Sequence, residues 1–495
     1  MRKSLLLSLT ILGLMAGNAF GQKVNLATGP ENKKADPKSL ISATIIDETP
    51  SSLLMITRDH GGFMHGASNE DVMFKLTDKG LNGLKEAKIV NSKECEVLGF
   101  GTTDTTATVL LCDKNRKTTE LSRAMIDRRS FKIVAADVVK DFRHERRDKE
   151  HIWHATSQDG QHTAVVVLTV TNNDTYSCEV VMLDQQMNME WDCKQPINGI
   201  SDMYLTNQGE LYVMAKHRVE MSTTLQINKF NAGSVETAEV VVPDGLHSCV
   251  IANVTNNRLL MGGSLIYPEA RHNETRCNAI FVLSYDMVAR QIVKFSTAEL
   301  HHNDLAVLAD KKQSARIRKY DVPDLIPDQT CTTEFGGAFT FTRPMAMVKT
   351  ASNGMETTYH NHIGMVVVGA DMNGNLLYKV PIRHYQMQTG GYDMMKAPLI
   401  SDGTNVFFFH TEHPKTTAEY NIAKRTKCVQ VMHDKVNTAM YAISPAGTVS
   451  KVVTSTKQKN LILGSSHAWY NGKYMLLHVG GKESHVLQMK NESAQ

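Results

Sequence analysis

Charge imbalance and long apolar runs are both missing from this 495-residue sequence. Its 54 Lys and Arg residues nearly balance its 51 Asp and Glu residues, giving a formal net charge of +3. A chain this close to neutral lacks the electrostatic footprint of nucleic-acid or membrane-surface binding. Beyond the first residues, no segment reaches the ~20 apolar residues that a membrane-spanning helix needs. We therefore expect no nucleic-acid partner and no membrane span in the mature chain.

Short motifs that identify enzymes are also missing. The sequence contains no G-x-S-x-G nucleophile elbow, no phosphate-binding P-loop and no H-E-x-x-H zinc motif. No two cysteines have the C-x-x-C spacing that is typical of metal-thiolate sites. The 51 acidic residues single out no pair placed across a cleft, as a glycosidase needs. These absences favour a protein that is not an enzyme, and they name no cofactor.

The first feature that is present is an export signal. Arg2 and Lys3 precede an apolar stretch from Leu5 to Met15, and Ala19-Phe20-Gly21 is a small-x-small cleavage pattern. The apolar stretch is too short to span a bilayer of about 30 Å. We expect residues 1–21 to be a signal peptide and residues 22–495 to be exported, to the periplasm, the cell surface or the medium.

A hairpin repeat with a spacing of about fifty residues dominates the rest of the chain. An apolar run, a short polar turn and a second apolar run recur, as in Gly99 to Asp113 and in Met203 to Lys216, and a second hairpin follows each one. Such a period indicates a solenoid, a propeller or an array, and strands as the unit favour a β-propeller. We predict an all-β fold, a single β-propeller of four-stranded blades over residues 22–495.

Paired hairpins predict seven complete blades, which begin near residues 41, 95, 150, 199, 247, 330 and 392. An eighth begins near Leu461 and is one strand short, and Lys23 to Gly29 supplies a suitable strand. Closing the ring with strands from both termini would remove the exposed sheet edges. We predict eight blades, with seven as the alternative. Two insertions interrupt the pattern, a partly helical excursion around 301–329 and a long loop at 416–437 that we expect to contact a partner.

Eight cysteines in an exported chain suggest disulfides, although eight cysteines allow 105 pairings. The hairpins narrow the choice, because two pairs flank single turns, one pair lies within a longer repeat, and the last pair would join neighbouring repeats. The predicted pairs are Cys95 with Cys112, Cys178 with Cys193, Cys249 with Cys277, and Cys331 with Cys428.

Twenty histidines are the feature that points most directly to chemistry. In the predicted register most of them fall in links between blades or in the loop between the second and third strands, and both sets of loops share one face of a propeller. Imidazole and carboxylate together suit zinc, manganese or iron, so a divalent transition metal is the one cofactor to consider. The candidate ligands lie in Tyr359-His360-Asn361-His362 and His410-Thr411-Glu412-His413, namely His360, His362, His410 and His413.

A competing interpretation needs no metal. In it, these are polar loop histidines that hydrogen-bond to turns or solvent, and it is favoured because H-x-H and H-x-x-H are weak motifs. A third cluster, His301-His302-Asn303-Asp304, opens a link between blades and is open to both interpretations.

One segment, Gly369 to Ile382 (GADMNGNLLYKVPI), carries a resemblance to a known class. It is similar to the strand-Asp-x-x-Gly-x-strand unit of many exported bacterial propellers, including proteins from Bacteroidota, and the whole repeat resembles secreted propellers of the broad PQQ-like and WD40-like type. The resemblance implies the fold and no catalytic residue. The chain departs from quinoprotein dehydrogenases because it has no adjacent Cys-Cys pair and only three Trp, and from WD40 repeats because Trp191-Asp192 is a single occurrence.

Two functions remain for a chain of this kind. The first is an exported, non-catalytic binding or scaffold propeller that recognises a protein or glycan partner through its loop face, since rigid scaffolds present many loops to partners. The alternative is a metal-dependent polysaccharide lyase or hydrolase that uses a histidine-rich central face. The absence of enzyme motifs favours the first.

Overall fold

A computed structural model describes the protein over residues 22–28, 39–62, 70–92, 95–114, 118–143, 149–171, 176–197, 199–219, 222–242, 245–266, 276–308, 322–323, 325–350, 356–389, 399–415, 420, 429–430, 435–459, 462–463, 469–470, 473–479 and 484–491. These residues form β-strands with one short helix, α2 (His302–Leu308). No helix among them is long and apolar enough to cross a membrane.

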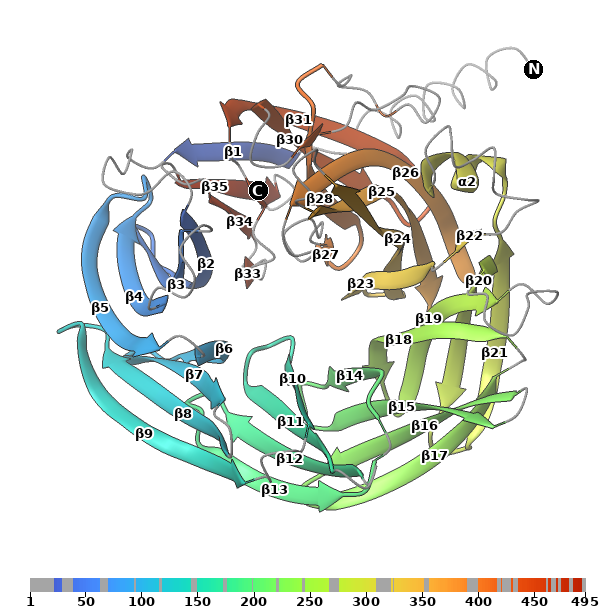
Figure 1. Ribbon diagram of the computed structural model, residues 1–495, viewed down its shortest axis with the longest axis horizontal. Helices are drawn as coiled ribbons and strands as arrows, with labels where there is room; N and C mark the ends of the chain where they lie inside the picture. Colours follow the sequence, from blue (N-terminus) through green and yellow to red (C-terminus); the bar gives the residue numbers. More distant parts are fainter. Residues whose placement is uncertain are drawn as a thin grey trace, which may run out of the picture.

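The strands form blades arranged as a ring around a central opening (Figure 1). Blades one to three contain β2 (Ser39–Glu48), β3 (Ser52–Gly62), β4 (Glu70–Asp78) and β5 (Gly83–Ser92); β6 (Cys95–Thr102), β7 (Thr106–Lys114), β8 (Thr118–Asp127) and β9 (Lys132–Arg143); and β10 (Lys149–Thr156), β11 (His162–Val170), β12 (Tyr176–Asp184) and β13 (Met189–Gln195). Blades four and five contain β14 (Asp202–Leu205), β15 (Leu211–Val219), β16 (Ser222–Asn231) and β17 (Ser234–Val242); and β18 (Leu246–Thr255), β19 (Arg258–Ile266), β20 (Arg276–Asp286) and β21 (Gln291–Glu299).

Blades six and seven carry the additions to this plan. Blade six contains β23 (Ile326–Thr332), β24 (Gly336–Thr350), β25 (Glu356–Asp371) and β26 (Leu376–Thr389), and blade seven contains β27 (Leu399–Ser401), β28 (Val406–Glu412), β30 (Lys435–Ile443) and β31 (Val449–Lys459). The predicted excursion around 301–329 supplies α2, which packs against β25 and β26, and β22 (Val322–Pro323), which pairs with β20. The predicted long loop supplies β29 (Val429–Gln430), which pairs with the outer strand β26.

The predicted count of eight blades is wrong, and the alternative count of seven holds. Each blade is a meander of four antiparallel strands, and seven sheets of the described residues have this form. The remaining sheet contains β1 (Gln22–Thr28), β35 (Ser484–Asn491), β34 (Lys473–Val479), β32 (Ile462–Leu463) and β33 (Trp469–Tyr470). It is not a regular blade, because two strands of two residues each take the place of its first strand, and because its outer strand comes from the opposite end of the chain.

This terminal sheet lies between blades seven and one, since β32 contacts β28 and β34 contacts β2. The predicted pairing of the two ends of the chain is confirmed in it. Strand β1 runs antiparallel to β35 over its whole length, from Gln22 opposite Asn491 to Thr28 opposite His485. The ends of the chain therefore cover sheet edges that would otherwise be open.

The hydrophobic core is divided among the interfaces between blades. Each of the six interfaces from blade one to blade seven holds its own cluster of buried apolar side chains, such as Val109 between blades one and two and Phe408 between blades six and seven. The second and third strands of a blade are buried on both faces, which explains runs such as the apolar stretch of β11. Every blade therefore depends on its neighbours to bury the apolar faces of its strands.

A recurring turn explains the Asp-containing unit that the sequence displays. In blades one, three and six, an aspartate ends the third strand, and its carboxylate accepts hydrogen bonds from the backbone and the side chain of the Asn four residues later. These aspartates are Asp78, Asp184 and Asp371. The carboxylate replaces the backbone partners that the turn lacks, and so it fixes the reversal between the third and fourth strands.

Candidate functional site

The structure places three of the four predicted metal ligands in strands rather than in loops. His360 and His362 occupy alternate positions of β25, opposite Ala346 and Pro344 of β24, and their side chains are outside the described part of the structure. His410 lies near the end of β28, and His413 follows that strand. Residues that were predicted to lie in loops therefore belong to the ends of strands, on the side of the ring that carries the links between blades.

His410 belongs to a buried polar network inside blade seven. Its Nε2 lies 2.9 Å from Oε1 of Glu412, and each of the two side chains is 1% exposed. Tyr441 donates its hydroxyl to the same Oε1 at 2.6 Å. Lys451 donates its ammonium to Oε2 at 2.7 Å, and its side chain is 2% exposed. Glu412 therefore accepts hydrogen bonds from Tyr441 and Lys451 and lies in close contact with the His410 ring.

Strand register brings these residues together. His410 and Glu412 are two apart in β28, so both project from the same face. Phe408 of that strand pairs with Tyr441 of β30, and Tyr441 pairs with Lys451 of β31. The rings of Phe408, His410 and Tyr441 stack with centroids 4.7 to 5.5 Å apart. The network is thus built from three strands of one blade and faces the core shared with blade six.

The electrostatics of this network keep Glu412 ionised. Burial alone would raise the pKa of Glu412, but the hydrogen bonds and charges of His410 and Lys451 lower that pKa to about 2. Burial and the adjacent Glu412 carboxylate raise the pKa of Tyr441, so its hydroxyl stays protonated and donates. The sequence interpretation named His410 and missed the other members, although the alternation of His410 and Glu412 in an apolar strand was a visible signal.

The described side chains do not form a metal site. Among the described side chains, no group of three or more His, Cys, Asp or Glu is placed to hold a metal ion. His413 uses its Nδ1 to accept a hydrogen bond from the backbone N–H of Lys415 at 3.1 Å. His362 pairs with Gln386, and the Gln386 amide donates to the hydroxyl of Thr411 at 2.6 Å, which brings the two predicted clusters to one corner of blades six and seven. A metal bound by His360 and His362 stays a prediction.

The predicted disulfides are not formed. Cys112, Cys178, Cys193, Cys249 and Cys331 are free thiols, and Cys428 lies outside the described residues. Register explains two of these corrections. Cys95 pairs with Asp113 and Cys112 pairs with Glu96, so the two cysteines project from opposite faces of blade two. Cys249 and Cys277 likewise pack into cores on opposite sides of blade five.

The Cys178 and Cys193 thiols differ from these, because they share one face of blade three. Cys193 pairs with Val180, which places it diagonal to Cys178 rather than directly opposite. Diagonal neighbours lie about 7–8 Å apart, beyond the reach of a disulfide without backbone movement. Burial raises the pKa of the Cys178 thiol to about 12, so this thiol is unreactive at neutral pH.

Asp202 is a second titratable group that the sequence interpretation missed. It opens β14, and its Oδ2 accepts a hydrogen bond of 2.5 Å from the backbone N–H of Ile251 in blade five. Burial raises the pKa of Asp202 to about 7, although hydrogen bonds from Ile251 and Met203 oppose the shift. Perturbed carboxyl groups of this kind are candidates for proton-linked behaviour. A lone aspartate at the start of a strand gives no signal in the sequence.

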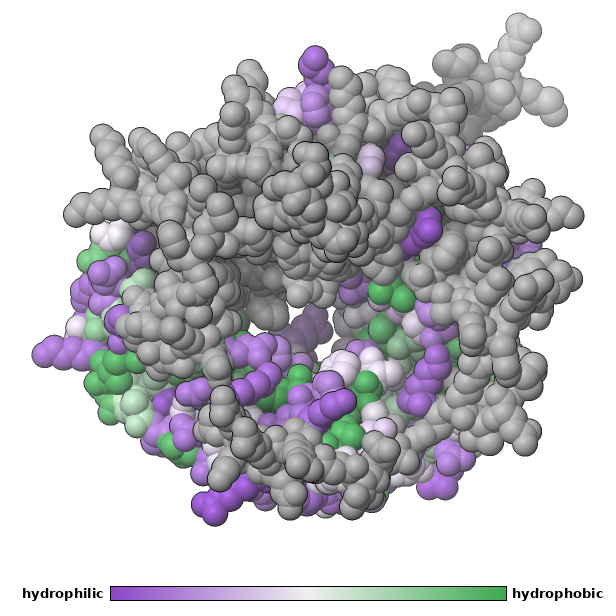
Figure 2. All heavy atoms as spheres, in the orientation of Figure 1, coloured by the Kyte–Doolittle hydropathy of each residue, from purple (hydrophilic) through white to green (hydrophobic). Residues whose placement is uncertain are grey.

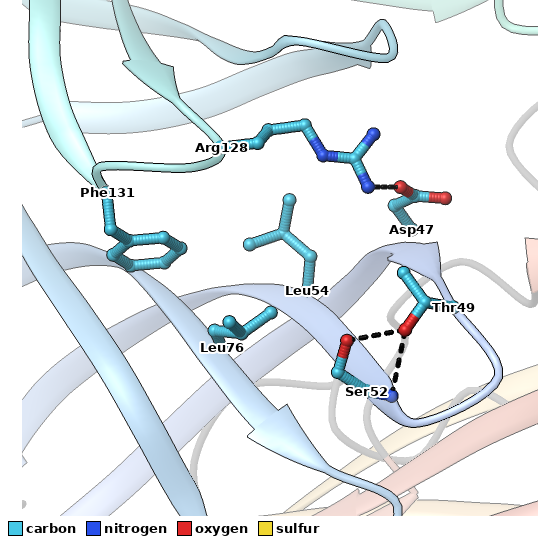
Figure 3. A pocket seen from close by; sticks show the side chains of 7 residues that line it. All are labelled: Asp47, Thr49, Ser52, Leu54, Leu76, Arg128 and Phe131. Carbon is cyan, nitrogen blue, oxygen red and sulfur yellow. Dashed lines mark hydrogen bonds and ion pairs between the residues drawn. The ribbon is translucent and has the colours of Figure 1, made fainter.

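A small hollow lies between blades one and two, on the face opposite the links between blades (Figure 3). Leu54, Leu76 and Phe131 form its apolar wall, and Arg128 crosses its mouth to pair with Asp47. It encloses about 250 Å³ including the open space at its mouth, below the roughly 300–1,000 Å³ typical of ligand pockets. Because Asp47 and the Thr103 carbonyl already engage the guanidinium, the hollow is a joint between blades.

Comparisons with known proteins add no function to these observations. No family model and no curated protein matches the chain. Similar solved structures include Sqt1 from Chaetomium thermophilum bound to the N-terminus of the ribosomal protein L10 (11% identity, TM-score 0.41, 94% of this chain and 99% of that chain), and the WD40 domain of SCAP from fission yeast (7% identity, TM-score 0.37, 94% and 97%). The polysaccharide lyase Uly1 is also similar (10% identity, TM-score 0.33, 94% and 99%). Likenesses this low carry no argument about activity, and the fold rests on the sheets themselves.

Proposed function

We propose that this protein is an exported, non-catalytic scaffold that binds a partner protein through the face carrying its long connections. The observation that carries the proposal is an asymmetry in connection length. All fourteen turns on one face, between the first and second or the third and fourth strands of the seven blades, contain two to five residues. The long connections, at 63–69, 267–275, 300–325, 390–398 and 413–434, all belong to the other face.

Such an arrangement suits recognition because the ring is rigid where the connections are anchored. Apolar clusters fill the interfaces between blades, and hydrogen bonds between turns of neighbouring blades reinforce them, as where the N–H of Glu334 donates to the carbonyl of Gly403 at 2.7 Å. Loops held by a rigid scaffold lose less entropy when they bind a partner. The leader predicted over residues 1–21 accounts for export in this proposal and lies outside the described residues.

The buried network of blade seven supports binding over catalysis. His410 and Glu412 are sealed from solvent, so a macromolecular substrate has no access to them in this conformation. The Glu412–Lys451 ion pair and the stacking of the His410 ring instead fix β28 at the point where the connection at 413–434 begins. The network therefore acts as a structural anchor for that connection.

The long loop predicted at 416–437 has structural anchors of its own. Tyr420 donates its hydroxyl to the carbonyl of Pro381 at 2.7 Å and meets the Tyr441 ring edge-on. Residues 429–430 add a strand to blade six. This aromatic ring is therefore engaged between blades rather than offered for stacking on a sugar, which favours a protein partner over a glycan. Deleting the whole loop would remove these contacts, so a test of function needs a milder change.

Site-specific photo-crosslinking provides that test. A photo-reactive amino acid replaces Lys415, which is exposed in the connection at 413–434, or Lys149, which is exposed at a link between blades on the same face. In matched controls it replaces Val288 or Asp104, which are exposed in turns of the opposite face. In extracts of the producing cells, we expect the probes at Lys415 and Lys149 to crosslink one and the same protein. An excess of the chain without the photo-reactive residue should reduce this crosslinking. Equal crosslinking from both faces would contradict the proposal. A crosslinked partner that survives protease digestion but is destroyed by periodate oxidation would be a glycan, which would also contradict it.

A further inference from the structure

Among the outer strands of the seven regular blades, β17 differs from the other six in its pairing. The fourth strands of the other six blades, β5, β9, β13, β21, β26 and β31, each pair with a register shift. Strand β17 pairs with β16 residue for residue, from Asn231 opposite Ser234 to Thr223 opposite Val242. Bulges bend an edge strand and are one device that keeps it from pairing with other chains. Among the described blades, blade four lacks this device.

The turn before β17 determines which of its backbone groups face outward. Ala232 and Gly233 both have positive φ, 45° and 84°, as in the two-residue type I′ turn of a tight hairpin. In such a hairpin the flanking residues exchange both hydrogen bonds, and hydrogen-bonded pairs alternate from there. Val235, Thr237, Glu239 and Val241 therefore direct their N–H and C=O groups away from β16. These groups lie along the rim, where β17 is the outermost ribbon of blade four (Figure 1).

The side chains of β17 also favour strand addition. The strand reads SVETAEVVV, which is rich in β-branched residues and contains no proline and no lysine. Thr237 and Glu239 are exposed, and the Val241 side chain is 63% exposed. Its only charges are those of Glu236 and Glu239, so the edge is anionic. Figure 2 shows hydrophobic and hydrophilic residues intermingled over the described part of the ring.

We infer that the outer edge of β17 binds an extended, basic segment of a partner protein, which adds a fifth strand to blade four. The outward N–H and C=O groups would supply the ladder of main-chain hydrogen bonds, as in other cases of strand addition. A lysine or arginine opposite Glu239 would supply the charge complement. This surface is on the rim and is separate from the loop face of the proposed function.

Charge also argues against a second copy of this chain as the occupant. Two β17 strands that overlap fully in antiparallel orientation, with outward residues paired, place the Glu239 side chains of the two copies at diagonal positions. No cation of either strand lies between them. Like charges at neighbouring positions of two strands oppose pairing, whereas a basic segment removes the repulsion.

Peptide binding to the purified full-length chain tests the inference. The probe is a fluorescein-labelled peptide of sequence Lys-Val-Lys-Thr-Lys-Val-Lys, followed by fluorescence anisotropy. We expect saturable binding that is lost when alternate amides of the peptide are N-methylated, because strand addition needs those N–H groups. The same peptide with Glu in place of Lys should bind at least about fivefold more weakly. Equal binding of the methylated and unmethylated peptides would overturn the inference. This comparison uses the wild-type protein and so does not depend on the folding of a variant.

Variants of β17 locate the binding surface. Thr237→Pro removes an outward N–H while leaving the ladder to β16 intact, and edge positions of this kind tolerate proline. We expect it to weaken peptide binding about tenfold or more, with Thr237→Ala as the matched control that keeps the N–H. Glu239→Lys should reverse the preference between the basic and acidic peptides.

Two further results complete the test. Unchanged peptide binding by a folded Thr237→Pro variant would overturn the inference. Sedimentation showing a dimer of the wild-type chain that Thr237→Pro dissociates would also overturn it, because the occupant would then be a second copy. Crosslinking from Lys415 should be unaffected by Thr237→Pro, so failure here is distinguishable from failure of the proposed function.

Discussion

Replacing Glu412 by Gln probes the buried network of blade seven at its centre. The change removes one charge and preserves the shape of the side chain, so Tyr441 still has an oxygen to which it can donate. Lys451, whose ammonium is 2.7 Å from Glu412 in the native chain, loses its counter-charge in a site where its side chain is 2% exposed. Removing one partner of a buried pair costs about 3–5 kcal/mol, because the other charge stays buried without compensation.

The pKa of Glu412 leads to a similar magnitude by an independent route. Its folded-state pKa of about 2 lies below the ordinary value of 4.5. One pKa unit corresponds to about 1.4 kcal/mol, so the shift represents roughly 3 kcal/mol of stability. Because the folded-state pKa is depressed, this contribution is fully present above pH 4.5 and is lost as the pH falls toward 2.

Urea unfolding of the wild type and Glu412→Gln at several pH values measures both effects. We expect the variant to be about 3 kcal/mol less stable at pH 7, with the difference shrinking below pH 4.5. Glu179→Gln is the matched control, since Glu179 pairs with Lys194 at 2.8 Å on the surface, where such a pair contributes about 0–1 kcal/mol. A loss below about 1 kcal/mol for Glu412→Gln, or a loss that does not change with pH, would refute the reasoning.

Four further outcomes follow from particular residues. Asp202→Asn should raise the thermal midpoint at pH 8 and change it little at pH 4, because a folded-state pKa raised from 3.8 to about 7 makes ionisation of Asp202 destabilising as the pH rises between those values; a midpoint shift of equal size at both pH values would contradict this. Gly101→Ala should strongly destabilise the ring, since a Cβ there would lie 1.7 Å from the Gln185 carbonyl of the next blade, whereas Gly83→Ala, with 3.7 Å to its nearest neighbour, should be tolerated in the same thermal melts. N-ethylmaleimide should label the partly exposed Cys193 of the native chain while the buried Cys112 reacts only in denaturant, and mass spectrometry of the peptides separates the two. Elemental analysis of the dialysed mature protein should find no stoichiometric transition metal, and one tightly held ion per chain would instead revive the metal-dependent alternative.

The strands and blade boundaries were largely predictable because they depend on local pattern. Alternating and continuous apolar runs, with Asp, Asn and Gly in the turns between them, marked the second blade near residue 95 and the third near 150, and the structure begins them at Cys95 and Lys149. The pairing of the N-terminal strand with the C-terminal strand was predictable because the last group of strands in the sequence is one strand short. The error in blade number arose where that pattern weakened, beyond Leu461, because short strands such as β32 and β33 carry little periodic signal.

The candidate site was less predictable because it depends on register and depth. His410 was singled out by its neighbours in the chain, yet its actual partners Tyr441 and Lys451 lie thirty or more positions away and meet it only through pairing across three strands. The disulfide predictions were wrong for the same reason. Cys95 and Cys112 flank one turn, but a single position of register decides whether two side chains share a face.

The amino-acid sequence by itself determined the repeating unit, because hydrophobic periodicity and turn chemistry act over a few residues and need no distant partner. Only the tertiary structure decided what each polar residue does. Burial between blades made His410, a predicted ligand, part of a buried network around Glu412, and it raised the pKa of Asp202. It also left β17 as the one outer strand of the seven regular blades with an unbroken register. These properties depend on which surfaces meet when the ring closes, since desolvation, charge pairing and register are set by neighbours that are remote in the chain.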